Sequence, residues 1–424
     1  MSRSRAGLLI AGLIWVCTTW LVIVPEVRLV TRLIQAGYFN EPRVDFLYFY
    51  TLGKMFNEYP AEKLYDYELQ NRVLTNLQPH PVTIYSPNPY PPFVGLLFRP
   101  FAKMPYTRAL LLWSFLSLSM YLGGVIVMTR RFFPGNWLRG SSILCFSLSL
   151  YPLVLTLNLG HISTIGFLAI CLALCEQDRG HQFRAGMCLS ACLYKPTLLL
   201  LFIPMLLITK RYRALAGFVA GGAAMAMLVT LAQGLSVWTG YAKLLFAFGS
   251  ASFHAHPYIN RLYYVDLSTF SALLPGGRRW FGLVPLFTAA ACAFTFLARA
   301  WRNSSVYPGT RDTLIWATTL MWTMVLNVYV PIYDCVLLVP GMIATLATLD
   351  RVPSGKSGAL LRLLWPAITF STWATVPVAE STGLQLLTPL IALIGTLQLA
   401  ALRIHSPDLH LKGDYVPALA AVST

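Results

Sequence analysis

The stretch from Val44 to Tyr67 combines acidic side chains with aromatic rings in an otherwise apolar chain. Asp45 lies near its start, where a carboxylate held close to a substrate hydroxyl could accept its proton. An aspartate there could equally cap the helix that we expect to follow, and the local sequence does not separate the two roles. We expect this stretch to serve binding or chemistry. Glu41, just before this stretch, and Asp66 within it are weaker candidates for the base, and we expect both to be solvated loop acids.

Two further ionisable residues interrupt apolar segments. Lys195 precedes Pro196 at a break between two apolar half-helices, and Asp334 lies just inside another apolar segment beside Tyr333. A charge at such depth is costly unless it is paired or hydrated, so it is a candidate functional group. The Lys195 ammonium could bind a phosphate, or the side chain could extend to the membrane surface. We expect Asp334 to face the same polar cavity as Lys195, and there to bind hydroxyl groups or orient a cation.

Histidines and one arginine complete the set of candidates. His161 follows Gly160 in a short uncharged turn, where we expect a hydrogen-bonded polar residue instead of a base. Arg261 is a second candidate to bind the phosphate. His254 and His256 have no nearby acid or cysteine, so we expect them to donate hydrogen bonds or pack within a loop.

We expect neither a metal nor a cofactor. The sequence contains no Asp-x-Asp pair, and its eight cysteines include no Cys-x-x-Cys pair. The cysteines all lie in apolar segments, which is typical of small packing residues and not of a zinc site or a disulfide framework.

The composition indicates an all-α, polytopic membrane protein. The chain has 424 residues, of which 56% are hydrophobic and 11% are charged. Apolar runs of about 18 or more residues recur along almost its whole length. The net charge of +16 lies largely in short loops between these runs, where it orients the helices, so we expect no nucleic-acid partner.

The distribution of Lys and Arg predicts about twelve crossings, with both chain ends in the cytoplasm. We expect one integral membrane domain, 1–424, with extracytoplasmic loops at 25–105 and 234–280. The first loop should contain short helices, and the apolar piece from Pro92 to Met104 should lie at the membrane interface. The expected spans are 7–24, which is retained and not cleaved, then 106–128, 141–159, 162–176, a pair broken at 194–196 within 186–209, 214–233, 281–299, 312–329, 332–349 and two more.

Several short motifs occur in order between residues 40 and 340. They are Asp45-Phe46 with Tyr50 and Gly53, Leu64-Tyr65-Asp66, Tyr90-Pro91-Pro92 with Pro100, Leu159-Gly160-His161, Ala185-Gly186 to Tyr194-Lys195-Pro196, and Tyr333-Asp334. With these motifs the chain resembles glycosyltransferase family 87, membrane enzymes of the GT-C fold that use a polyprenyl-phosphate sugar. Two positions depart from the family. His161 stands where Gln is usual, and Tyr333-Asp334 stands where mannose-transferring members tend to have a His-Tyr pair.

The resemblance implies an inverting hexosyltransferase that moves a hexose, mannose by family default, from a polyprenyl phosphate to a lipid or glycan acceptor. It implies a multi-pass protein of the cytoplasmic (inner) membrane, with the active site on the extracytoplasmic side and Asp45 as the catalytic base. The candidate substrate-binding residues are Lys195, Arg261, Tyr50, Tyr90, His161, His254, His256, Tyr333 and Asp334. Two alternatives stay open: a transporter of lipids or lipid-linked sugars, and a glycan polymerase or ligase.

Overall fold

The computed structural model describes residues 44–77, 88–249, 261–274, 280–303, 310–351 and 355–404. Within these ranges the chain is helical and has no β-strand, which confirms the predicted all-α class. The expected first span at 7–24, together with Glu41, His254 and His256, lies outside the described residues.

Three short helices lie in the predicted first outer loop: α3 (Val44–Glu58), α4 (Tyr67–Asn76) and α5 (Pro92–Phe98). The next helices are α6 (Tyr106–Phe132), α7 (Trp137–Leu148), α8 (Tyr151–Leu159), α9 (Ser163–Asp178), α10 (Gln182–Ser190), α11 (Phe202–Ile208) and α12 (Tyr212–Gln233). The remaining helices are α13 (Ser236–Gly249), α14 (Leu267–Leu273), α15 (Trp280–Arg302), α16 (Thr310–Val325), α17 (Leu338–Arg351), α18 (Gly355–Thr382) and α19 (Leu387–Ile404).

Three helical segments of the described chain are long and apolar enough to cross a membrane: Tyr106–Phe132, Tyr212–Gln233 and Ile332–Arg351. Helices α7 and α8 together would make a fourth, although they bend by 56° at the break between them. These segments support a membrane protein. The number of about twelve crossings stays a prediction.

The span predicted at 141–159 corresponds to α7 and α8, which are bent by 56° relative to one another and do not form one straight helix. Pro152 lies in the first turn of α8, where it cannot donate the backbone hydrogen bond that would continue α7. The carbonyl oxygen of Ser149, freed at the break, accepts a hydrogen bond of 2.7 Å from the indole of Trp373. A side chain from α18 thereby satisfies the backbone carbonyl group that the bend leaves without a helical partner.

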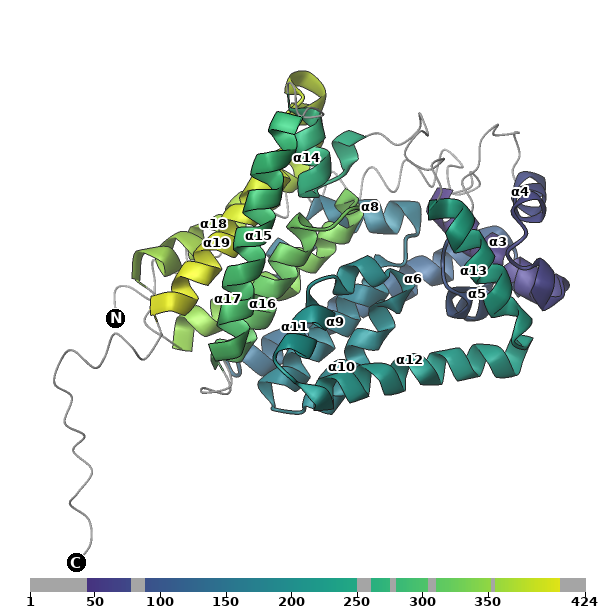
Figure 1. Ribbon diagram of the computed structural model, residues 1–424, viewed down its shortest axis with the longest axis horizontal. Coiled ribbons are helices and arrows are strands. Elements are labelled where there is room, and N and C mark those ends of the chain that lie inside the picture. Colours follow the sequence, from purple (N-terminus) through teal and green to yellow (C-terminus); the bar gives the residue numbers. More distant parts are fainter. Residues whose placement is uncertain are drawn as a thin grey trace, which may run out of the picture.

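Glycine contacts hold α10 against α12, which runs along it and extends beyond it toward α13 (Figure 1). A Cβ atom on Gly186 would overlap the carbonyl oxygen of Ala214, and one on Gly217 would overlap that of Phe183. The two backbones therefore touch directly, because only glycine leaves room at these positions.

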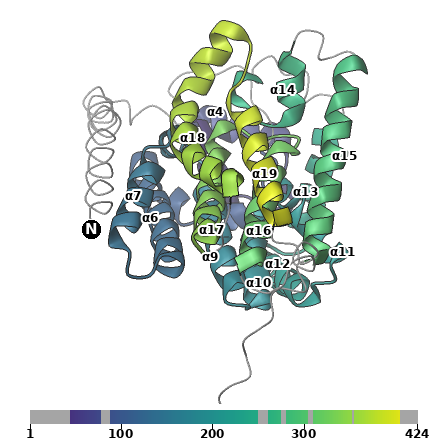
Figure 2. The same cartoon turned by 90° about the vertical axis from the view of Figure 1, so that its left-hand side faces the viewer.

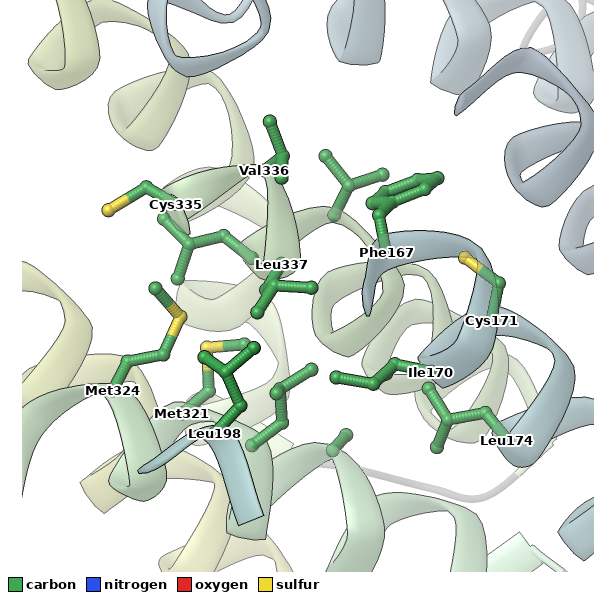
Figure 3. Close-up of a cluster of buried hydrophobic side chains, with 14 of the residues drawn as sticks. Phe167, Ile170, Cys171, Leu174, Leu198, Met321, Met324, Cys335, Val336 and Leu337 are labelled. Carbon is green, nitrogen blue, oxygen red and sulfur yellow. The ribbon is translucent and has the colours of Figure 1, made fainter. Parts of the chain in front are cut away.

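The second half of the chain packs α16 against both α17 and α19, with α15 and α18 at the outside (Figure 2). A buried apolar cluster joins this half to α9. In Figure 3, side chains from α9, α16 and two 3-10 helices, η6 (Pro196–Leu199) and η10 (Ile332–Leu337), point toward one another. Its labelled members are Phe167, Ile170, Cys171, Leu174, Leu198, Met321, Met324, Cys335, Val336 and Leu337.

Helices α3 and α5 form a compact unit beside the main bundle. Gly53 lies so close to α5 that a Cβ atom would overlap the carbonyl oxygen of Phe98, and Gly95 is covered in the same way by the ring of Phe56. Phe46 and Phe49 lie three residues apart and share one buried face of α3. This close packing fixes the direction of α3 and hence the place of Asp45 in its first turn.

Candidate functional site

The turn between α8 and α9 lies against the first turn of α3. Gly160 adopts a left-handed conformation (φ 66°), and a Cβ atom there would lie 2.6 Å from the Cβ of Phe46. Its carbonyl oxygen accepts a hydrogen bond of 2.9 Å from the indole of Trp113. Glycine at this position therefore lets the turn carrying His161 dock against the first turn of α3, which carries Asp45.

A second element of the site is the predicted break at Lys195. Helix η5 (Ala191–Tyr194) ends there, and η6 begins at Pro196, so Lys195 takes the non-helical conformation that a following proline favours. The chain breaks again before η10, which starts after Pro331. The Asn327 side chain donates a hydrogen bond of 2.9 Å to the carbonyl oxygen of Thr197 and ties the two breaks together.

Lys195 and Asp334 form a buried ion pair between these two breaks. The Lys195 ammonium donates to Asp334 Oδ2, and the side chains are only 10% and 0% exposed. The ammonium lies 4.7 Å from the centre of the Tyr329 ring and 5.8 Å from that of Tyr333, close enough for cation–π attraction. Lys195 is therefore directed into the protein and not toward the membrane surface.

Hydrogen bonds connect the same carboxylate to the turn after α8. The Ser163 hydroxyl donates to Asp334 Oδ1 over 2.6 Å, and Ser163 Oγ lies 2.6 Å from His161 Nδ1. The other ring nitrogen, His161 Nε2, lies 2.9 Å from the Tyr90 hydroxyl. The imidazole ring also packs on Tyr333, with 4.0 Å between ring centres. Four candidates from distant parts of the chain, Tyr90, His161, Tyr333 and Asp334, thus meet in one cluster.

Asp45 differs from these residues in one of its carboxylate oxygens. Asp45 Oδ2 is buried, and no hydrogen-bond donor among the described residues reaches it. Burial raises the pKa of Asp45 from 3.8 to about 7, with a smaller lowering by Lys195 and a further raising by Asp334. A carboxylate with a pKa near neutrality is suited to take and return a proton at physiological pH.

The capping alternative for Asp45 receives less support from the geometry. A capping residue precedes the helix and accepts from backbone N–H groups of the first turn. Asp45 instead follows Val44 inside α3, where its negative charge still favours the helix N-terminus. Asp66 provides the contrast, since it precedes α4 and accepts a hydrogen bond of 3.0 Å from the Leu69 backbone.

Comparison with known families decides the class of the protein. The model of glycosyltransferase family 87 matches residues 88–327, which is more than half of the chain. The chain belongs to glycosyltransferase family 87. The resemblance seen in its motifs is thereby confirmed. Searches of curated proteins and of solved structures each returned no match.

Family membership makes this membrane protein a glycosyltransferase, which requires a sugar donor and an acceptor. The matched region contains Tyr90, His161 and Lys195, whereas Asp45 and Asp334 lie outside its two ends. The structure nevertheless places both acids within electrostatic range of Lys195.

Two candidates of this family 87 enzyme lie away from the cluster or at its edge. The Tyr50 hydroxyl donates to the carbonyl oxygen of Met104 over 2.7 Å, and its ring packs on Tyr106, which is a packing arrangement. Arg261 is half-buried at the start of a 3-10 helix, η8 (Arg261–Tyr263). Tyr264 directly follows η8, and its hydroxyl donates a hydrogen bond of 3.2 Å to the Tyr329 hydroxyl. This bond links the segment to the Tyr329 ring that contacts the Lys195 ammonium.

The sequence did not single out Ser163 or Asn327, although both organise the site. Ser163 follows His161 by two residues in a turn, and serine at that spacing often bonds locally, which is a weak signal. Asn327 gave no comparable signal, because its partner Thr197 is 130 residues away in the chain.

Metal ligands do not gather in the part of the enzyme that the structure describes. No group of three or more His, Cys, Asp or Glu side chains in that part could hold a metal ion.

Burial lowers the pKa of His161 to about 3, with a raising by Asp334 and a lowering by Lys195, so its ring is neutral at physiological pH. A neutral, hydrogen-bonded His161 agrees with the polar turn residue expected from the sequence. A neutral His161 ring cannot serve as a cation that binds the phosphate.

Proposed function

We propose that this glycosyltransferase moves a hexose, with mannose as the first candidate, from a polyprenyl phosphate to a hydroxyl of a lipid or glycan acceptor. Asp45 is the catalytic base. The observation that carries this proposal is the buried Asp45 Oδ2, which has no donor among the described residues and belongs to a carboxyl with a pKa raised to about 7. A buried acceptor without a donor is costly, so its retention beside a cation indicates a role in chemistry.

The proposed reaction is a single displacement. Asp45 takes the proton of the acceptor hydroxyl as that oxygen attacks the anomeric carbon, and the bond from this carbon to the phosphate oxygen breaks. The phosphate leaves with the bonding electron pair, and attack from the opposite side inverts the configuration. The Lys195 ammonium, buried beside tyrosine rings, would bind the anionic phosphate both before and during its departure.

Other residues near this centre would contact the sugar or the lipid phosphate. The aromatic rings of Tyr90 and Tyr333 flank His161 and would border the sugar. Arg261 would supply a second positive charge to the phosphate from η8, three residues before Tyr264. In this proposal the donor phosphate thus meets cations from two separate segments.

We also propose a GT-C-like arrangement with about twelve crossings and the site on the extracytoplasmic side of the inner membrane. The ion pairs support one part of this arrangement. Asp178, in the last turn of α9, pairs with Arg131 of α6 and Arg351 of α17. The basic ends of these helices thus gather together, whereas Ser163 lies at the opposite end of α9. Basic loops mark the cytoplasmic side of a membrane.

Cysteine labelling tests the proposed orientation. A cysteine placed near residue 70, at the exposed position 68, or near residue 260 should react with an impermeant reagent in intact cells, and one at 137 or 355 should not. Labelling of position 68 only after permeabilisation would place Asp45 on the cytoplasmic side and contradict the proposed donor.

The donor itself is tested with purified enzyme and a panel of sugars. The panel holds mannose and glucose as polyprenyl monophosphates, a diphosphate-linked glycan and a nucleotide sugar. We expect transfer from a monophosphate donor alone. Asp66→Asn is a matched control, because this exposed cap should keep full activity. Use of the nucleotide sugar would contradict the proposal, and use of the diphosphate glycan would favour the polymerase or ligase alternative.

A further inference from the structure

The hydrogen bonds that join Tyr90 to Asp334 run in one direction. Asp334 Oδ1 can only accept when the carboxylate is ionised, so the Ser163 hydroxyl must give it its single proton over 2.6 Å. Ser163 Oγ then has lone pairs toward His161 Nδ1, at 2.6 Å, so that nitrogen must carry the ring proton. The bare Nε2 in turn accepts from the Tyr90 hydroxyl over 2.9 Å.

The opposite tautomer of His161 would satisfy one contact of Ser163 and break the shorter one to Asp334. It would let Nδ1 accept from the Ser163 backbone N–H, which lies 3.1 Å away. The Ser163 hydroxyl would then donate to Nδ1 and leave its oxygen facing Asp334 Oδ1 at 2.6 Å without a proton between them. Two buried acceptors at that distance repel, so the contact to a carboxylate selects the Nδ1–H form.

The last acceptor in this series of hydrogen bonds is the Asp334 carboxylate, which also pairs with Lys195. Ser163 occupies Oδ1 of Asp334, and the Lys195 ammonium occupies Oδ2, so neither oxygen can turn without losing a charge-assisted bond. Fixing Asp334 thereby fixes the ammonium over the rings of Tyr329 and Tyr333. An ammonium has three N–H groups, so two stay available for a ligand once Asp334 has taken one.

We propose that Tyr90, His161 and Ser163 are positioning residues of the donor site, which lock Asp334 and through it hold Lys195 ready for an anionic phosphate. This inference rests on the proposed function, which makes Lys195 the phosphate ligand. Pre-organisation of this kind strengthens binding, because the ordering cost is met before the ligand arrives. The role concerns donor binding, whereas Asp45 serves the acceptor.

A pair of substitutions at His161 separates positioning from packing. Gln and Met have similar length and volume, but the Gln amide offers one acceptor for Tyr90 and one donor for Ser163, whereas Met offers neither. We expect His161→Gln to keep the donor KM within about threefold of wild type. We expect His161→Met to raise the donor KM about tenfold or more while kcat changes little, which corresponds to losing one charge-linked hydrogen bond.

Ser163→Ala tests the next link of the chain. It should raise the donor KM by a similar factor, and it should add little to the effect of Lys195→Met, because both act on the same ammonium. Ser147→Ala is the matched control. That serine is also fully buried, but its hydroxyl donates only within its own helix, to the Ile143 carbonyl oxygen over 2.7 Å.

Direct binding of polyprenyl phosphate without a sugar keeps the test independent of turnover and shows that each variant is folded. We expect its thermal stabilisation of the enzyme to be retained in His161→Gln and reduced in His161→Met and Ser163→Ala. Equal behaviour of the Gln and Met variants, or additive effects of Ser163→Ala and Lys195→Met, would overturn the inference. Failure of the wild type to bind polyprenyl phosphate would overturn both proposals. Normal turnover of Asp45→Asn would remove only the proposed base.

Discussion

Asp45 and Asp334 are two carboxylates of one site with opposite surroundings. Asp334 has a donor on each oxygen, the Ser163 hydroxyl and the Lys195 ammonium. Asp45 Oδ2 has none among the described residues, and burial raises the pKa of Asp45 to about 7. The comparison shows how two identical side chains take different roles. The partnered carboxylate anchors a cation, and the unpartnered one is free to exchange a proton.

The two acids also differ in the elements that hold them. Asp334 belongs to η10, which packs into the apolar cluster that joins the two halves of the bundle. Asp45 belongs to α3, which is held mainly by α5, with further contacts to α4, to the 3-10 helix η4 (Phe101–Lys103) and to the turn at Gly160. The anchor therefore lies in the segment that joins the two halves, while the base is carried by a helix of the predicted first outer loop.

The largest expected effect is the loss of transfer in Asp45→Asn. Asn keeps the size of the side chain but cannot accept the proton, and a positioned base contributes roughly 10²–10⁴-fold in rate. We expect kcat to fall by that factor, with donor binding and thermal stability unchanged or slightly improved. Steady-state kinetics and thermal unfolding measure both. Turnover within a few-fold of wild type would move the base elsewhere, with Asp334 the next residue to test.

Asp334→Asn should instead act on stability. It leaves the Lys195 ammonium buried without its counter-ion, and breaking one side of a buried ion pair costs about 3–5 kcal/mol. Thermal unfolding in detergent should show a clear loss that Asp45→Asn does not share.

The double variant Lys195→Met/Asp334→Leu sharpens this prediction. It removes both charges together and should recover much of the lost stability, because replacing a whole buried pair by apolar groups is often neutral. It should remain inactive with the lipid donor. Equal stability of Asp334→Asn and wild type would contradict the anchoring role.

Lys195→Met breaks the same buried pair and should also lose stability, and in the folded enzyme it should weaken donor binding. Met keeps much of the apolar stem and removes the charge, so one charge-assisted bond to the phosphate is lost, worth on the order of 1.5–3 kcal/mol. A donor titration should show a roughly tenfold to hundredfold rise in KM with a smaller change in kcat. An unchanged titration would show that the phosphate binds elsewhere, and Arg261 would be the residue to examine.

The last prediction is a pH dependence that belongs to Asp45 alone. The base acts in its ionised form, and burial raises the pKa of Asp45 to about 7. The transfer rate should therefore rise about tenfold per pH unit below neutrality and level off above it. The residual activity of Asp45→Asn should lack this rise below neutral pH, whereas the activity of His161→Gln should keep it. A flat profile for the wild type between pH 5 and 7 would contradict the raised pKa.

The sequence indicated the membrane class and the break at Lys195, because long apolar runs and a proline after a charged residue carry those signals locally. It also placed Asp45 in the first turn of a short helix. It could not show that Ser163 bonds to Asp334, since 171 residues separate them and the contact depends on how the halves pack. The unpartnered state of Asp45 has the same origin, because it reflects what surrounds the side chain in space.

A mutational scan scored by product formation would rank Gly53 and Gly95 beside the chemical residues of this enzyme. Neither supplies a side chain, yet any substitution would push α3 away from α5, since the space for a Cβ is already filled by Phe98 and Phe56. Asp45 lies eight residues from Gly53, about 12 Å along the helix, so a tilt of about 5° would displace its carboxylate by about 1 Å. A small tilt of α3 about its contact with α5 at Gly53 is therefore enough to move Asp45. A shift of about 1 Å can reduce a rate by about 10²-fold.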